Sequence, residues 1–114
     1  MNIKRGEIWL ACLDPVIGKE ISKTRPVVII SNDLNNKYSG TVTILPLTSK
    51  HLEKIYPFEV LLPIGSGNLP KNSKVKADQV RTLDKQRMIR WLGQLKTDEL
   101  VKVEEALKIH LGFQ

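Results

Sequence analysis

Three side chains suited to phosphate chemistry lie at the ends of apolar runs in the first half of the chain. Glu20 stands in a polar loop, Arg25 follows at the start of the run RPVVIIS, and Thr48 ends the run TVTILPLT. An arginine matches phosphate oxygens with a planar fork of donors, a threonine hydroxyl can donate a further hydrogen bond, and a carboxylate can accept a proton. These three residue types could together act on a phosphate ester.

Two further polar side chains interrupt an apolar strand face later in the chain. In KVKADQVRT, the face that carries Val75 and Ala77 continues by strand alternation to Gln79 and Arg81. We therefore expect a pocket at the rim of a small barrel, lined by Arg25, Thr48, Gln79 and Arg81. Taken singly, these residues have simpler interpretations, namely a salt bridge from Arg25 to Glu20 and polar strand ends that face water.

Other catalytic and metal chemistries lack the residues that they need. The chain holds one cysteine, Cys12, and its two histidines, His51 and His110, are far apart in the sequence, which excludes a zinc site. The stretch GSG lacks the lysine and the helix that complete a phosphate-binding loop. Cys12, Trp9 and Trp91 lie in apolar stretches and are expected to be buried, whereas His51 is expected to be an exposed loop residue.

Composition indicates one basic globular domain that covers residues 1–114. The chain has 18 Lys and Arg against 12 Asp and Glu, a formal net charge of +6, and this excess favours a polyanionic partner. Basic residues concentrate between positions 71 and 90, whereas residues 97–111 are net acidic. No apolar run approaches the roughly 18 residues of a membrane span, and no signal peptide is recognisable, so we expect a cytoplasmic protein without a membrane partner.

The pattern of apolar residues predicts a mainly β fold with short helices. Residues 27–30 are apolar at every position, which is typical of a central strand covered on both faces. Strands are expected at residues 6–14, 25–31, 41–48, 56–63, 73–82 and 88–95, with a short helical turn or loop at 33–40. The period then changes to that of a C-terminal amphipathic helix, capped by Thr97 and with an apolar face at Leu100, Val103, Leu107 and Leu111.

The order of these segments resembles the MazF/PemK family of toxin endoribonucleases over nearly the whole chain. The resemblance rests on RGEIWLACLDPVIGKE, RPVVIISND, ILPLTS, YPFEVLL and ADQVRTLDKQR, in this order and spacing. It implies an SH3-like barrel of the MazF, Kid and CcdB type, a homodimer, and neutralisation by a small acidic, MazE-like antitoxin. No metal or other cofactor is expected.

The resemblance assigns the active site to Glu20, Arg25 and Thr48. It implies a sequence-specific mRNA interferase that cleaves single-stranded RNA through attack of the ribose 2′-OH, leaves 2′,3′-cyclic phosphate and 5′-OH ends, and arrests growth. Arg25 and Thr48 would stabilise the charge on phosphorus, and Glu20 would accept the 2′ proton or orient Arg25. Further RNA contacts are expected at Lys19, Asn32, Ser49, Lys74, Lys76, Asp78, Gln79 and Arg81.

The chain departs from many members of this family in the loop after Glu20. It has Ile21, Ser22, Lys23 and Thr24 where those members carry glycines and a glutamine, so their preferred RNA sequence does not transfer. Two other classes of protein would fit part of the pattern. A non-catalytic nucleic-acid-binding barrel would use the basic stretch without the active-site residues, and a CcdB-like topoisomerase poison would share the fold, bind a protein and leave RNA intact.

Overall fold

The computed structural model describes residues 1–113, which form seven β-strands, two α-helices and three short 3₁₀ turns. In chain order the elements are β1 (Glu7–Cys12), β2 (Thr24–Ile29), α1 (Asp33–Tyr38), β3 (Thr41–Thr48), β4 (Glu59–Leu62), β5 (Ser73–Lys76), β6 (Arg81–Asp84), β7 (Met88–Gln94) and α2 (Thr97–Leu111). The 3₁₀ turns lie at Ser66–Asn68, Ala77–Gln79 and Lys85–Arg87.

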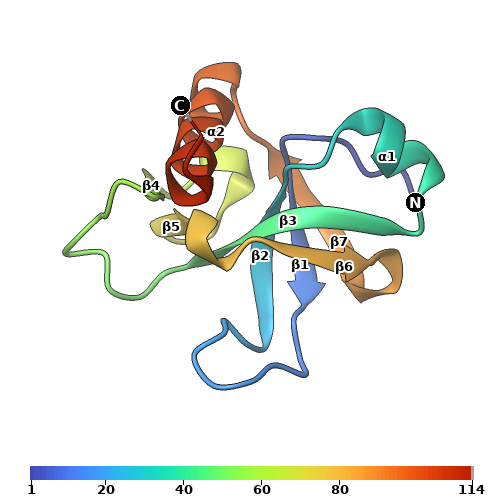
Figure 1. Ribbon diagram of the computed structural model, residues 1–114, viewed down its shortest axis with the longest axis horizontal. Helices are drawn as coiled ribbons and strands as arrows, with labels where there is room; N and C mark the ends of the chain where they lie inside the picture. The colour runs from blue at the N-terminus through green and yellow to red at the C-terminus, as the bar shows by residue number, and fades with distance from the viewer. Residues whose placement is uncertain (114) are drawn as a thin grey trace.

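All of the strand pairs are antiparallel, and they follow the order β4-β5-β3-β2-β1-β7, with β6 also paired to β3 (Figure 1). The mainly β, SH3-like architecture with a C-terminal helix is therefore confirmed. The sheet is open, because β4 and β7 at its two edges do not pair with each other in the described part of the chain. The connection between β1 and β2 extends beyond the sheet as a long loop, on the side away from α2 (Figure 1).

β2 lies at the centre of the packing and is covered on both faces. Val27 and Ile29 pack into one apolar cluster, and Val28 and Ile30 pack into the other, which also includes buried residues of α2. The predicted two-sided central strand is confirmed. Because side chains pack against both faces of β2, the strand is a rigid mount for Arg25 at its beginning.

Residues 73–82 do not form the single strand that the sequence predicts. β5 and β6 both pair with β3, but the 3₁₀ turn at Ala77–Gln79 separates them. The alternation from Val75 to Arg81 is therefore broken, and Gln79 projects from a turn. A strand pattern in the sequence did not reveal this turn, because it contains neither glycine nor proline.

Three smaller predictions fail at element ends and at the sheet edge. Trp9 is buried as expected, but Trp91 is 49% exposed because β7 is an edge strand. Cys12, the last residue of β1, is partly exposed. The helix α2 begins at Thr97, so its N-cap is Lys96, whose backbone N–H donates to the Glu99 carboxylate over 3.0 Å.

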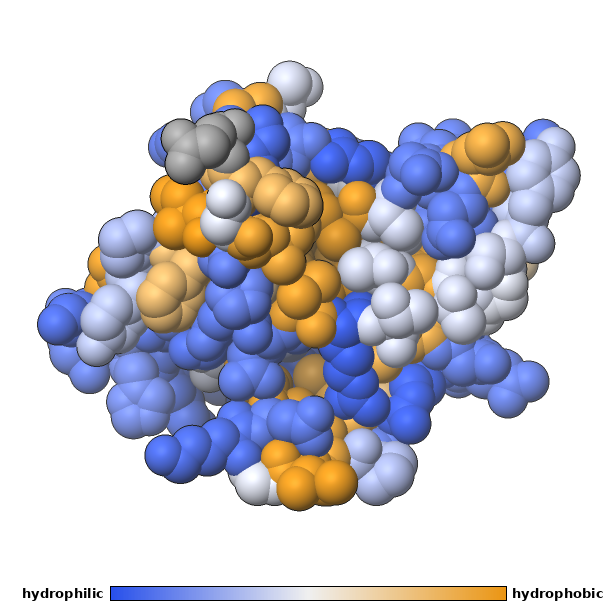
Figure 2. All heavy atoms as spheres, in the orientation of Figure 1, coloured by the Kyte–Doolittle hydropathy of each residue, from blue (hydrophilic) through white to orange (hydrophobic). Residues whose placement is uncertain are grey.

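The surface around α2 is apolar on one face of the molecule. Hydrophobic residues gather there in Figure 2, and the exposed apolar side chains of α2 include Val101, Ile109 and Leu111. Leu111 was expected to pack on the sheet, but it lies in the last turn of the helix and is 46% exposed. Neither helix in residues 1–113 has the length and apolar character needed to cross a membrane.

Candidate active site

A hollow of about 230 Å³ lies beside the strand ends that carry Arg25 and Thr48. We call it the Arg25 hollow. Its apolar lining comes from β1, β2, β3 and β7 and from Pro70, and none of the residues that line it is Asp or Glu. Its cations are Arg25, Lys71 and Arg90, and its hydroxyl groups belong to Thr24, Thr48, Ser49 and Ser73. The structure thus brings Arg25 and Thr48 together with Ser49, but the prediction of one pocket that also includes Gln79 and Arg81 is wrong, because these two side chains line a separate hollow.

The Arg25 guanidinium is held at one nitrogen and is free at the other two. Arg25 is half-buried in β2, and its Nε donates to the Ser22 carbonyl oxygen over 3.1 Å. Within residues 1–113, its terminal nitrogens make no hydrogen bond, and the side chain forms no ion pair. A guanidinium fixed through Nε presents its remaining donors in a set direction, as phosphate recognition requires.

Thr48 ends β3, where its backbone is in register with Lys74 of β5. Its Oγ1 accepts a hydrogen bond from the Lys50 backbone N–H over 3.2 Å. This bond uses the oxygen as an acceptor and leaves the hydroxyl hydrogen available to donate. Thr48 can therefore offer a hydrogen bond to an anion in the Arg25 hollow.

A second hollow, of about 380 Å³, lies under the β1–β2 loop. We call it the Gln79 hollow. Its charged residues are Lys19, Glu20, Asp78 and Arg81, so two cations face two carboxylates. The rest of its lining is Gln79 and apolar side chains of the loop, of β3 and of Val80. This hollow therefore has no excess of positive charge.

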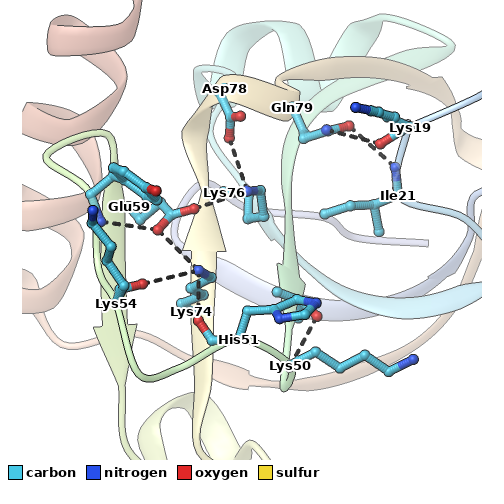
Figure 3. Close-up of polar contacts among 12 residues, drawn as sticks. Lys19, Ile21, Lys50, His51, Lys54, Glu59, Lys74, Lys76, Asp78 and Gln79 are labelled. Atoms are coloured by element: carbon cyan, nitrogen blue, oxygen red, sulfur yellow. Dashed lines mark hydrogen bonds and ion pairs between the residues drawn. The ribbon is translucent and has the colours of Figure 1, made fainter.

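Gln79 fastens the β1–β2 loop on both sides of Glu20. Its side-chain Oε1 accepts from the Ile21 backbone N–H over 3.2 Å, and its Nε2 donates to the Lys19 carbonyl oxygen over 3.4 Å (Figure 3). Arg81 fastens the beginning of the same loop, since its Nη1 donates to the carbonyl oxygen of Leu13 over 2.7 Å. Both side chains were expected to contact RNA, and the structure instead places them against the loop backbone.

Glu20 is separated from Arg25 in this structure. Its carboxylate accepts a hydrogen bond from the Ile17 backbone N–H over 2.5 Å and lines the Gln79 hollow. Within residues 1–113 it forms no ion pair, so the simple interpretation of an Arg25–Glu20 salt bridge is wrong. The Ser22 carbonyl oxygen, rather than Glu20, orients the guanidinium.

Lys74 and Lys76 belong to a buried ionic cluster around Glu59 (Figure 3). Lys74 is 4% exposed, and its Nζ donates to Glu59 and to the carbonyl oxygens of His51 and Lys54, at 2.9 to 3.2 Å. The expected RNA contact by Lys74 therefore has no geometric basis here, because all three of its protons have partners inside the protein. The sequence-based expectation missed this because strand alternation alone does not tell which polar face is covered.

Hydrogen bonds and ion pairs within the cluster keep Glu59 and Lys76 charged despite the cost of burial. Burial opposes ionisation of Glu59, but hydrogen bonds from Lys76, the Tyr56 backbone and Lys74 lower its pKa below the usual value. Burial likewise opposes the charge on Lys76, but the Glu59 carboxylate and the nearby Asp78 raise the Lys76 pKa above the usual value. The Lys76 Nζ lies 2.9 Å from Glu59 Oε2. Lys76 is thus engaged in the cluster rather than free for a phosphate.

Asn32 lies at a different place in the fold from the other predicted RNA contacts. Its side-chain Oδ1 accepts from the Asn35 backbone N–H over 2.8 Å and caps the helix α1. It lines a shallow groove with residues of α2, and it borders neither the Arg25 hollow nor the Gln79 hollow. Asparagine is among the preferred N-cap residues, which explains its position before α1 without reference to RNA.

Two cations of the Arg25 hollow, Lys71 and Arg90, were not among the predicted site residues. The sequence did contain a signal, since both lie within the basic stretch between positions 71 and 90. What the sequence did not show was that β7 pairs with β1, which brings Arg90 beside the strand that carries Leu10. Among the described residues, no three His, Cys, Asp or Glu side chains are grouped so that they could hold a metal ion.

Comparisons with known proteins agree with this architecture. Residues 4–111 match the family of PemK-like, MazF-like toxins of type II toxin–antitoxin systems. The chain is 40% identical to endoribonuclease MazF9 of Mycobacterium tuberculosis, over 97% of this chain and 98% of that protein. It also resembles the crystal structure of MazF from Deinococcus radiodurans, with a TM-score of 0.85, 31% identity and coverage of 99% of both chains. A chain of a MazE–MazF crystal structure from the same organism matches with a TM-score of 0.78, 29% identity and full coverage of both chains. The chain belongs to the family of PemK-like, MazF-like toxins of type II toxin–antitoxin systems.

Proposed function

We propose that this toxin is an endoribonuclease that cleaves single-stranded RNA at the Arg25 hollow and so acts as an mRNA interferase. The observation that carries the proposal is the free, oriented guanidinium of Arg25 beside the hydroxyl of Thr48, in a hollow with no carboxylate. The endoribonuclease named among its relatives, at 40% identity over nearly the full length, supports the same activity.

The residues of the hollow suit a transesterification within RNA. The ribose 2′-OH would attack the adjacent phosphorus and give up its proton, the bond to the departing 5′-oxygen would break, and that oxygen would take up a proton, so the ends would be a 2′,3′-cyclic phosphate and a 5′-OH. Arg25 and Thr48 would bind the non-bridging oxygens, where negative charge increases in the transition state. This chemistry uses the RNA's own hydroxyl as nucleophile and uses fixed donors of the protein.

Glu20 is the proposed acceptor of the 2′ proton. A general base must come within about 2.6–3.2 Å of the proton donor, or act through one water molecule. Glu20 lines the neighbouring hollow, so this role requires the 19–22 segment of the loop to shift when RNA binds, or the RNA to reach into both hollows. Catalytic hydrogen bonds often tighten only in the substrate complex, so a loop residue can still serve this role.

The proposed assembly and location follow from the family. A structure of MazE with MazF from Deinococcus radiodurans supports an antitoxin as partner, and the net charge of +6 favours an acidic one. We also propose that the protein is a cytoplasmic homodimer, and that residues 1–114 act as a single toxin domain without a cofactor.

The decisive test is to map cut sites and end groups on a defined RNA of mixed sequence, in buffer that contains EDTA. Cyclic phosphate and 5′-OH ends at a short recurring sequence are expected, together with no cleavage of a duplex or of RNA with a 2′-deoxy nucleotide at the cut site. Intact RNA with the wild-type toxin would contradict the proposal and favour a topoisomerase poison or a binding module. Cleavage that vanished in EDTA and returned with magnesium would contradict the metal-independent mechanism.

A further inference from the structure

Two cations of the Arg25 hollow have no part in the reaction described above. Arg90 lies in β7 and Lys71 lies in the segment between β4 and β5, and both residues are exposed. Within residues 1–113, neither side chain forms an ion pair. With Arg25 they place three positive charges around one small hollow, and like charges at close range repel unless an anion lies between them.

Strand pairing defines where Arg90 stands relative to Arg25. Leu10 of β1 is in register with Pro26 of β2 on one side and with Arg90 of β7 on the other. Neighbouring strands lie about 4.8 Å apart, so the Arg90 backbone is about 10 Å across the sheet from Pro26, the residue that follows Arg25. Leu10 of this row lines the hollow, and so does Leu92, two residues beyond Arg90 on β7. The two arginines therefore flank an apolar strip, a layout that suits a chain in which phosphates alternate with sugars and bases.

The two arginines also differ in how they are held. Arg25 is half-buried and bonded through Nε, whereas Arg90 is exposed and no hydrogen bond of its side chain is found among residues 1–113. A fixed donor favours the transition state, but a mobile charge binds substrate and transition state about equally. We propose that Arg90 and Lys71 bind an RNA phosphate next to the one that reacts, and so extend the substrate site to β7. This inference rests on the proposed function.

The test measures the salt dependence of RNA binding. Arg90→Gln and Lys71→Gln are compared with Lys102→Gln, which removes the same charge from an exposed position on α2 that does not line the hollow. The probe is a single-stranded RNA with a 2′-deoxy nucleotide at the mapped cut site, and affinity is read by fluorescence anisotropy. Each lost phosphate contact should weaken binding and lower the slope of log affinity against log salt by about 0.7. Single-turnover cleavage at saturating RNA should stay within about twofold of wild type.

Each outcome separates this inference from the function on which it rests. An unchanged slope in Arg90→Gln would overturn the inference, and so would an equal fall in slope for Lys102→Gln, which would mean that charge acts diffusely. A large loss of single-turnover rate at saturation would also overturn it, because Arg90 would then act on the reacting phosphate. Arg90→Lys should keep the wild-type slope, which a purely structural defect would not predict. Failure of the wild-type toxin to cleave RNA would instead contradict the proposed function.

Discussion

The Arg25 hollow and the Gln79 hollow both adjoin the β1–β2 loop, but they use polar residues in opposite ways. In the Arg25 hollow, three cations face no carboxylate, and the terminal nitrogens of Arg25 are free. In the Gln79 hollow, charges are balanced, and the side chains of Gln79 and Arg81 are bonded to loop backbone. An uncompensated hollow suits an anionic substrate, whereas a balanced and internally bonded hollow suits the support of a loop.

The two hollows are linked through a short piece of backbone. Gln79 forms hydrogen bonds with the backbone of Lys19 and Ile21, and Arg25 donates a hydrogen bond to the carbonyl oxygen of Ser22, the residue after Ile21. The position of the loop therefore influences the direction of the Arg25 guanidinium. The comparison predicts that Arg25 and Thr48 act on the reaction directly and that Gln79 and Arg81 act through the loop, whereas Glu20, which lines the Gln79 hollow, needs a test of its own.

The largest effect is expected from the Arg25 hollow itself. Arg25→Ala and Thr48→Ala should each lower the single-turnover rate of RNA cleavage by on the order of a hundredfold or more, because each removes a donor placed for the charge on phosphorus. The thermal midpoint should stay near that of wild type, since neither side chain is part of the apolar clusters. Lys19→Ala, which removes a charge from the Gln79 hollow, is the control and should have a much smaller effect. Wild-type rates in both hollow variants would remove the basis of the site assignment.

Substitution of Glu20 tests whether the β1–β2 loop supplies a proton acceptor for the reaction or only positions its neighbours. If its carboxylate accepts the 2′ proton, Glu20→Gln should lower the rate by about a hundredfold, a typical value for the loss of a general base. Glutamine keeps an acceptor for the Ile17 backbone N–H, so a rate near that of wild type would indicate that Glu20 only shapes the loop through this bond.

Sequence patterns predicted the strands better than the contacts of the polar side chains, because strands depend on nearby residues and these contacts depend on residues that are distant in the sequence. β3 spans Thr41–Thr48 as expected, because a dense apolar run has one way to be buried on both faces. Arg25 and Thr48 were predicted to lie at strand ends because each stands at one end of such a run, Arg25 at the start of β2 and Thr48 at the end of β3. The turn at Ala77–Gln79 and the burial of Lys74 were missed, because they depend on pairing with β3 and on Glu59, which is distant in the sequence. Polar contacts between distant segments leave no periodic signal.

The segment 73–79 borders both hollows, so the ionic cluster around Glu59, which holds this segment, should affect both hollows. Ser73 lines the Arg25 hollow, Gln79 lines its neighbour, and Glu59 holds the two lysines between them. Glu59→Gln would leave the buried Lys74 ammonium group without its counter-charge and should lower the free energy of unfolding by about 3 kcal/mol at neutral pH. Chemical denaturation of variant and wild type measures this difference.

The contribution of this ionic cluster to the free energy of unfolding depends on pH in a defined way. The Glu59 pKa is lowered in the folded protein, so its contribution is present above the ordinary value of 4.5 and is lost as the pH falls through the lowered pKa. The Lys76 pKa is raised, so its contribution is present below the ordinary value of 10.5 and is lost as the pH rises through the raised pKa. The stability difference between wild type and Glu59→Gln should therefore be constant near neutrality and shrink in acid. A difference that grew in acid would show that the cluster does not stabilise the fold in this way.

The smallest and most discriminating effect is expected at Gln79. Gln79→Met keeps the length of the side chain but removes both bonds to the loop, so it should lower the single-turnover rate by about tenfold, in line with two lost hydrogen bonds of modest net strength. If Gln79 acts through the loop, the affinity for single-stranded RNA and the set of sequences cut should not change. If instead it reads RNA directly, as the sequence alone suggests, the preferred cut sites should change. Gln86→Met is the control, because Gln86 is exposed and lines neither hollow. An altered cut-site profile with an unchanged rate at the preferred site would assign Gln79 to recognition, and the Gln79 hollow would then be part of the RNA surface rather than the support of the loop.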